Sequence, residues 1–291
     1  MDVTALRSDA RRRTSVALLD DAAAPALARL LDADPIVNAV VAARVRAVGT
    51  LASHRLGGFI AGVQDGADLA AGCFSGGNLL PLGGGPDSWE AMAHFVAGRP
   101  RVCTSISGRA EAVQAMWSPL TKVWGPARTL RLVQPLLAVD VVPQVVPDYE
   151  VRAAQPQHLD RYLSAAVAMF TEELGVSPRV SPGSMAFRTR VSDLIATGRA
   201  FARFDFRGQV MFKAEIGAVT AHTCQIQGVW VRPDLRGSGI ATGGLATVLA
   251  HALALAPTAS LYVNDFNVPA RRLYARLGMS HVATLSTVLM P

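Results

Sequence analysis

The chain has 291 residues, which is enough for two domains of about 145 residues that each bury a core of their own. Hydrophobic residues make up 51% of the chain and charged residues 17%, which excludes a disordered protein and a disulfide-rich scaffold. The net charge is +6, but the only tight basic run is Arg11–Arg13, so we expect no nucleic-acid partner. A mild positive field still favours an anionic ligand.

The apolar character of the chain does not predict a membrane segment. The longest strongly apolar stretch, Ala246–Leu261, is interrupted by His251 and Pro257 and is too short to span a bilayer. No apolar run follows the N-terminal arginines, so we expect no signal peptide, no membrane partner and a cytoplasmic protein. Three isolated cysteines lie at no metal-binding or disulfide spacing and predict buried thiols and no metal: Cys73, Cys103 and Cys224.

The first half is predicted to alternate between strands and helices, with one hairpin. We expect strands over 15–19, 57–63, 68–74, 78–82, 101–106 and 129–139, and helices over 25–32, 36–45, 87–97 and 110–117. A stretch with two prolines follows at 141–148. Because proline removes a backbone donor and fixes φ, this stretch is typical of an extended linker between two domains, over 1–142 and 148–291.

The second half is predicted to repeat the order of the first. We expect strands over 149–153, 200–206, 210–219, 222–231, 260–263 and 280–289, and helices over 158–174, 185–196, 242–256 and 269–277. Both halves end in a strand, a glycine-rich loop, a helix, a strand, a helix and a strand. This repetition favours a diverged internal duplication of a mixed α/β sheet, and two unrelated α/β halves are the alternative.

The segment VWVRPDLRGSGIA, from Val229 to Ala241, is predicted to form a strand, a short arm and a glycine loop that opens a helix. Glycine lets the main chain approach a ligand, and the N–H groups at a helix start favour an anion, so we expect a phosphate cradle. No lysine follows the glycines, which excludes a P-loop. Thr242 stands where a Rossmann fingerprint needs its third glycine, which disfavours that fold.

This segment resembles the pyrophosphate arm of the GNAT superfamily of N-acetyltransferases, whose pattern Q/R-x-x-G-x-G/A is matched by Arg236, Gly239 and Ala241. The segment LYVNDFNVPARRLYARLGM, at 261–279, is similar to the second cofactor motif of the family, with Met279 in place of the usual Phe. The resemblance covers about 149–291. It implies a mixed sheet splayed between its fourth and fifth strands, with acetyl-coenzyme A in the opening.

The resemblance also implies roles for individual residues. Strand residues Val229, Trp230 and Val231 would offer backbone groups to the pantetheine and the thioester carbonyl, and Asn267 would hydrogen-bond the pantetheine arm. Tyr274 would protonate the leaving thiolate. The pyrophosphate would be held by the loop: Arg236, Gly237, Ser238, Gly239, Ile240, Ala241 and Thr242. Two further readings stay open, with Asn267 as a helix N-cap and Tyr274 as a packing residue.

The general base is less defined by the sequence. An attacking amine must lose a proton, and Gln225 and Gln227 on the fourth strand of the second half cannot accept it. We predict that Glu215 or Glu173 is the base. The other candidates are Glu172, His222 and the free C-terminus at Pro291.

The first half is expected to be a degenerate GNAT-like domain. No arginine precedes Gly83–Gly85, Pro86 removes a donor, and Asp87 adds a negative charge, so we expect one acetyl-coenzyme A per chain. Mycothiol synthases pair two such domains, but we favour an actinobacterial GNAT type with an uncharacterised N-terminal half. The predicted function is transfer of an acetyl group to a primary amine of unspecified class by direct attack on the thioester. The alternatives are a mycothiol-synthase-like small-molecule acetyltransferase and a non-catalytic acyl-coenzyme A sensor or scaffold.

Overall fold

The computed structural model describes residues 15–178 and 184–291. The first half contains β1 (Val16–Leu18), η1 (Asp21–Ala23), α1 (Ala24–Asp32), α2 (Ala39–Val48), α3 (Ser53–Leu56), β2 (Phe59–Asp65), β3 (Asp68–Ser75), β4 (Asn78–Gly83), α4 (Pro86–Ala97), β5 (Ser105–Arg109), α5 (Ala110–Trp124) and β6 (Thr129–Val139). The single turn of α3 was not predicted, because four residues are too few to show a helical period. Helix α5 runs past its predicted end and contains Pro119.

The second half contains β7 (Arg152–Ala153), η2 (Pro156–His158), α6 (Leu159–Leu174), α7 (Ser184–Ala196), β8 (Ala200–Phe204), β9 (Val210–Val219), β10 (Thr223–Val231), η3 (Pro233–Leu235), α8 (Ile240–Leu253), β11 (Thr258–Tyr262), α9 (Val268–Arg276) and β12 (Ser280–Leu289). The stretch 141–148 has no helix or strand, as predicted. Apart from the short helix α3, the structure has the predicted order of helices and strands in both halves.

The strands form one twelve-stranded mixed sheet in the order β1-β2-β3-β4-β5-β12-β6-β11-β10-β9-β8-β7. Two neighbouring pairs are parallel, β4 with β5 and β10 with β11, and the other pairs are antiparallel. Each parallel pair is joined by a crossover helix, α4 in the first half and α8 in the second. The predicted mixed α/β fold of two similar halves is confirmed.

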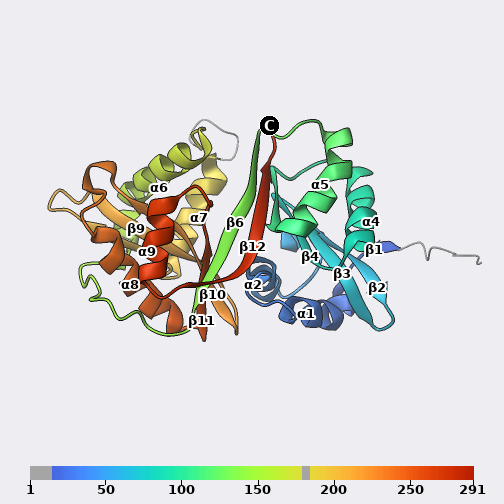
Figure 1. The fold of residues 1–291 in the computed structure, drawn as a ribbon, viewed down its shortest axis with the longest axis horizontal. Helices are drawn as coiled ribbons and strands as arrows, with labels where there is room; N and C mark the ends of the chain where they lie inside the picture. The colour runs from blue at the N-terminus through green and yellow to red at the C-terminus, as the bar shows by residue number, and fades with distance from the viewer. Residues whose placement is uncertain (1–14, 179–183) are drawn as a thin grey trace, which may run out of the picture.

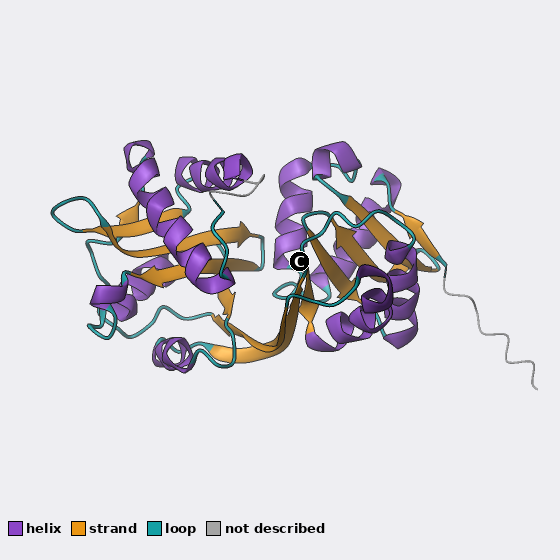
Figure 2. Cartoon of the chain, turned by 90° about the horizontal axis from the view of Figure 1, so that it is seen from above, coloured by secondary structure: helices purple, strands orange, loops and turns teal. Residues whose placement is uncertain are grey.

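The two halves exchange their last strands. Strand β12 lies between β5 and β6, and β6 in turn lies between β12 and β11. Figure 1 shows β6 and β12 side by side at the centre of the molecule, and Figure 2 shows strands bridging the two helix-covered halves. The sheet is consequently continuous across the linker, and each half completes the sheet of the other.

Helices cover both faces of the second half of the sheet. Helix α8 buries Leu245, Val248 and Leu249 against strand residues that include Phe212 and Ile226. On the other face, Tyr162 of α6 and Leu194 of α7 pack with Trp230 and other residues in a separate cluster. Alternate residues of β10 therefore point into different cores, as the two-residue period of a strand requires. No helix in the described part of the chain is long and apolar enough to cross a membrane.

Candidate active site

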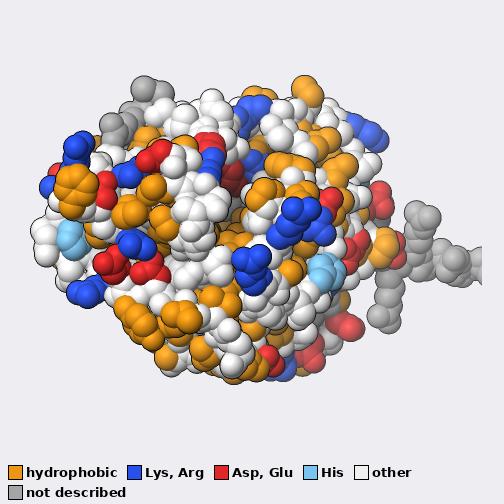
Figure 3. All heavy atoms as spheres, turned by 60° about the vertical axis from the view of Figure 1, so that its left-hand side comes forward, with side chains coloured by type: hydrophobic (Ala, Val, Ile, Leu, Met, Phe, Trp, Pro, Cys, Tyr) orange, Lys and Arg blue, Asp and Glu red, His pale blue; other side chains and the backbone are white. Residues whose placement is uncertain are grey.

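Strands β10 and β11 lie together only at their starts. Their register pairs Thr223 with Thr258 and Gln225 with Ser260, and no pairing follows along the rest of the described strands. Beyond these pairs the two strands diverge, at the point where the sequence resemblance implies a splay. We call this gap the β10–β11 opening. On the face drawn in Figure 3, the surface is hollowed between the two halves, and charged side chains gather around the hollow.

A β-bulge bends β10 beside this opening. Gln227 pairs with Glu215 and Trp230 with Lys213, so two residues of β10 stand opposite the single residue Ala214 of β9. Gly228 has a φ of +62°, a left-handed conformation in which a residue with a side chain is strained. The bulge shifts the alternation of β10 by one residue and thereby sets which groups of 229–231 face the opening.

The glycine loop after β10 forms an open cradle of N–H groups. Gly237 and Gly239 have φ values of +79° and +88°, and a Cβ at either position would meet no atom within 4 Å. Within the described residues, the backbone N–H groups from Gly237 to Ala241 make no hydrogen bond to protein. The N–H of Thr242 is used, because it donates to the Gly239 carbonyl at 2.9 Å. The cradle fits a pyrophosphate at the start of a helix.

The Arg236 side chain turns away from this cradle. Its guanidinium binds both carboxylate oxygens of Glu172 at 2.7 Å and also donates to the Val231 carbonyl at 3.1 Å. Hydrogen bonding to Arg236 holds the pKa of Glu172 below its usual value. Arg236 therefore ties the arm to the end of α6, and its backbone N–H already donates to the Pro233 carbonyl at 3.3 Å.

Tyr274 is buried in α9, with 7% of its surface exposed. Burial and the negative charge of Glu173 raise the pKa of its phenol to about 12. The hydroxyl makes no hydrogen bond to any other described residue. Asn267 begins the same helix, and its side chain accepts the Ala270 N–H at 3.2 Å. The N-cap reading of Asn267 is therefore confirmed.

The two predicted bases lie in different surroundings. The half-exposed carboxylate of Glu173 pairs at 2.9 Å with Arg131, a residue of β6 from the first half. Glu215 is buried and lies 2.9 Å from the Lys213 ammonium, with Gln227 donating to it at 3.2 Å. Burial alone would raise the pKa of Glu215, but Lys213 outweighs it, so the pKa of Glu215 lies below its usual value.

The remaining candidates lie elsewhere. His222 stands at the turn between β9 and β10, at the far end of β10 from the glycine loop, with its Nε2 3.4 Å from Asp32. The chain end lies against the first half, where the Met290 N–H donates to the Thr104 carbonyl. Among the described residues, no three His, Cys, Asp or Glu side chains form a group able to hold a metal ion.

Sequence reasoning missed Lys213 and Arg131. The signal for Lys213 was present, because Lys213 and Glu215 are the only charged residues in the apolar strand VMFKAEIGAV and are two apart, hence on one face. Arg131 carried no comparable signal. Its contact with Glu173 exists only because β6 joins the sheet of the second half.

The equivalent loop of the first half is crowded by protein at its first two glycines. A Cβ at Gly83 would meet Leu30 at 2.8 Å, and one at Gly84 would meet Ala71 at 2.7 Å. The indole N–H of Trp89 donates to the Gly83 carbonyl at 2.8 Å and occupies the space beside the loop. Only Gly85, the N-cap of α4, has open space, since a Cβ there would meet no atom within 4 Å, so this described loop is crowded at two of its three glycines.

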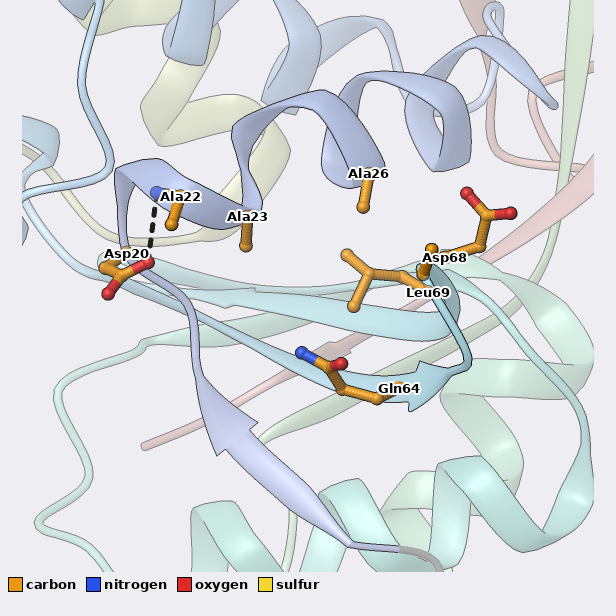
Figure 4. A pocket seen from close by; sticks show the side chains of 8 residues that line it. Asp20, Ala22, Ala23, Ala26, Gln64, Asp68 and Leu69 are labelled. Atoms are coloured by element: carbon orange, nitrogen blue, oxygen red, sulfur yellow. Dashed lines mark hydrogen bonds between the residues drawn. The ribbon is translucent and has the colours of Figure 1, made fainter.

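Another hollow of the first half lies between α1 and the β2–β3 hairpin (Figure 4). Asp20 at its edge accepts the Ala22 N–H at 3.0 Å and so caps η1, and most of the other side chains around it are alanine. The other carboxylate around it, that of Asp68, pairs with Arg29 at 2.6 Å, so local structure explains both acidic groups.

Family comparisons agree with this geometry. Residues 163–279 match the model of the acetyltransferase (GNAT) family, and residues 58–162 match a domain of unknown function, DUF4081. The C-terminal region of the chain is thus a GNAT acetyltransferase domain, of a family that transfers an acyl group from acetyl-coenzyme A to an acceptor. No curated protein sequence matches this chain.

Solved structures share the fold over nearly the whole chain. A Drosophila protein is similar with a TM-score of 0.68 at 11% identity, covering 95% of this chain and 98% of the other. A GCN5-related N-acetyltransferase from Sphaerobacter thermophilus has a TM-score of 0.56 at 19% identity, covering 96% and 97%. A tandem GNAT protein from the clavulanic acid biosynthesis pathway has a TM-score of 0.50 at 13% identity, covering 94% and 98%.

Proposed function

We propose that the protein is an acetyl-coenzyme A-dependent N-acyltransferase that moves an acetyl group to a primary amine by direct attack on the thioester. The observation that carries this proposal is the run of free N–H groups from Gly237 to Ala241. They follow the part of β10 that no longer pairs with β11. Convergent N–H donors at a helix start stabilise an anion such as a pyrophosphate. When bound, acetyl-coenzyme A supplies an activated acyl group.

The cofactor-binding residues follow the β10–β11 opening from one end to the other. Backbone groups of Val229, Trp230 and Val231 would face the pantetheine and the thioester carbonyl. Asn267 would bind the pantetheine arm from the start of α9, in addition to its capping role. The pyrophosphate would lie on the backbone N–H groups of Gly237, Ser238, Gly239, Ile240 and Ala241, with Arg236 anchoring the arm through Glu172 and Thr242 closing the turn.

Tyr274 is proposed to stabilise the leaving sulfur with its hydroxyl, and Glu173 to accept the proton of the attacking amine. The raised pKa of Tyr274 keeps its phenol protonated at neutral pH, so the hydroxyl can donate to the sulfur as the thioester bond breaks. Glu173 would accept the proton that the amine loses as its nitrogen attacks. We favour Glu173 over Glu215 because its carboxylate is half exposed and its charge acts on Tyr274, whereas Glu215 is buried and paired.

The two-domain division at 1–142 and 148–291 is part of this proposal, with the cofactor held by the second domain. The crowding of Gly83 and Gly84 by Leu30, Ala71 and Trp89 supports a degenerate first domain. A mycothiol-synthase-like protein with two working sites is less favoured for the same reason.

A non-catalytic acyl-coenzyme A sensor is the second candidate function. It is favoured by the fact that each candidate glutamate already has a cationic partner: Glu172 with Arg236, Glu173 with Arg131, and Glu215 with Lys213. A sensor would bind the cofactor and release no thiol in the presence of amines.

Release of free coenzyme A, measured against a broad panel of amines, tests the proposal. We expect amine-dependent release by the whole chain and cofactor binding by titration calorimetry. Binding without release for every amine would favour the sensor. No binding would overturn both readings.

A further inference from the structure

A lysine is fully buried beneath the bulge of β10. Lys213 has 0% of its surface exposed and is in register with Trp230, directly beside the bulge. Its ammonium donates to the Gly228 carbonyl at 2.9 Å and to the Glu215 carboxylate at 2.9 Å. It also lies 3.6 Å from the Met169 sulfur. Burying an ammonium has a large desolvation free energy cost, even when its hydrogen bonds are satisfied. A functional role for Lys213 would explain why the fold tolerates this cost.

The groups around the Lys213 ammonium compensate its positive charge. Its counter-ion Glu215 receives a hydrogen bond from Gln227 at 3.2 Å and lies 3.4 Å from the Tyr162 hydroxyl. The Tyr162 ring also lies 5.3 Å from the ammonium. All of these groups lie on the α6 side of the sheet, and together they neutralise one positive charge next to one backbone carbonyl.

The carbonyl that Lys213 binds belongs to Gly228, a residue of the bulge. A Cβ at Gly228 would lie 2.9 Å from the Lys213 ammonium, so the left-handed glycine and the lysine fit each other closely. Without the bulge, the alternation of β10 would slip by one residue, and Val229, Trp230 and Val231 would exchange faces. The direction of the backbone groups at the β10–β11 opening therefore depends on the bulge.

We propose that Lys213 is a positioning residue whose ammonium holds the Gly228 carbonyl and so fixes the bulge that aims 229–231 into the β10–β11 opening. Glu215 serves as its counter-ion. The proposal rests on the proposed function only where turnover is concerned. The arrangement of β10 itself is a property of the protein without ligand.

Three variants separate positioning from simple stability. Lys213→Met and Glu215→Gln each leave one buried charge unpaired, so both lower the melting temperature. The double variant K213M/E215Q has no unpaired charge and regains most of that loss. It still lacks a donor for Gly228, so its bulge stays loose. Arg109→Met is the matched control, because it removes an ion pair with Asp34 within the first half, away from β9 and β10.

Hydrogen exchange of the ligand-free protein is the first readout. In K213M/E215Q we expect faster exchange in peptides that cover 226–231, with unchanged exchange in other strands of the second half. The R109M variant should keep native exchange in that segment. Native exchange in K213M/E215Q would overturn the proposal, whatever the activity of the wild type.

Cofactor binding and turnover are the second readout. By calorimetry we expect K213M/E215Q to lose the difference in affinity between acetyl-coenzyme A and coenzyme A, since the acyl group meets a misaligned strand. We expect kcat to fall on the order of tenfold to a hundredfold, the scale of a misplacement of about 1 Å, with a smaller change in KM. A wild-type kcat in the double variant would overturn the positioning role. If the proposed acetyltransferase function is wrong, the wild type will show no turnover. The faster hydrogen exchange expected in K213M/E215Q would still be observed in that case.

Discussion

At the scale of single residues, the burial of Tyr274 determines which role its phenol can have in the proposed reaction. Its phenol is buried with no hydrogen-bond partner among the described residues, and Glu173 raises its pKa further, to about 12. A thiol has a pKa of about 8.5, so complete proton transfer from this phenol to a free thiolate is uphill. The role that fits is a hydrogen bond that strengthens as negative charge develops on sulfur.

Tyr274→Phe therefore tests this hydrogen-bonding role directly. We expect kcat to fall about a hundredfold while the affinity for acetyl-coenzyme A is unchanged, because the hydroxyl acts on the leaving sulfur and not on the bound ground state. Steady-state kinetics together with calorimetry measures both quantities. Tyr149→Phe is the matched control, since Tyr149 is 77% exposed in the linker. Normal turnover in Y274F would remove Tyr274 from the mechanism.

The raised pKa of Tyr274 also predicts how stability depends on pH. The ordinary value is 10, and the folded value is about 12, so the unfolded chain loses this proton first. The stabilising contribution is complete below pH 10 and is lost as pH rises toward 12, at about 1.4 kcal/mol per pH unit. Urea unfolding at increasing pH should show a shallower loss for Y274F than for the wild type. Identical slopes would contradict the assigned environment. Some slope remains in the variant, because the pKa values of Tyr162 and Tyr262 are raised as well.

The structural role of a residue was predictable from the sequence where that role depends on residues nearby in the chain. Asn267 caps α9 by accepting the N–H of Ala270, three residues further along the chain. Gly237 and Gly239 adopt the positive φ that a tight loop before a helix requires. The partners of the glutamates were not predictable in the same way. Glu173 and Arg131 are 42 positions apart, and Glu172 and Arg236 are 64 apart.

At the scale of elements, two equivalent loops differ in their surroundings. The loop before α8 is open at both left-handed glycines, whereas the left-handed glycines before α4, Gly83 and Gly84, are crowded by Leu30, Ala71 and Trp89. The helix that follows each loop has the same place in the fold. We therefore expect any difference in ligand binding between the two loops to come from the side chains packed on each of them.

Gly239→Val tests the open loop. A branched side chain there is strained by the φ of +88° and would stand where the backbone meets the pyrophosphate, so we expect loss of acetyl-coenzyme A binding by calorimetry. Gly125→Val is the matched control, because Gly125 has a φ of +81°, also has open space around it, and lies at the end of α5. It should lose comparable stability and keep binding. Equal affinity in both variants would mean that the cradle is misassigned.

The crowded loop of the first half predicts the stoichiometry. We expect one acetyl-coenzyme A per chain by titration calorimetry, because Gly83 and Gly84 are crowded by side chains, whereas Gly237 and Gly239 are open. Trp89→Ala should not create a second site, since Pro86 still lacks an N–H and Asp87 is still negative. Two equivalent sites in the wild type would favour a mycothiol-synthase-like protein.

At the scale of the whole molecule, the exchanged strands make the halves interdependent. Strand β6 belongs to the first half in sequence but fills the space between β11 and β12, where Val139 is part of the core of the second half. Strand β12 reaches back in the same way, and Val288 and Met290 lie in the core of the first half. A division at the linker therefore cuts through two cores.

Fragments of the chain test this interdependence. A fragment of residues 148–291 lacks β6, so it exposes the unpaired edges of β11 and β12, and we expect it to aggregate or to melt without cooperativity. A fragment of residues 126–291 retains β6 and is the matched control, with higher solubility and a cooperative transition by circular dichroism. A shorter fragment that melts like the longer one would contradict a structural need for β6.

The sequence by itself determined the order of elements, the mixed α/β class, the glycine loop before α8 and the place of Tyr274 on its helix. These features follow from periodicity, turn chemistry and spacing over a few residues, which a single sequence displays directly. The tertiary structure alone decided the exchange of β6 and β12, the ion pair of Arg131 with Glu173, and the burial of Lys213 beneath the bulge. These depend on strand pairing and register between distant segments, and the free energy that selects one register comes from packing in the folded core.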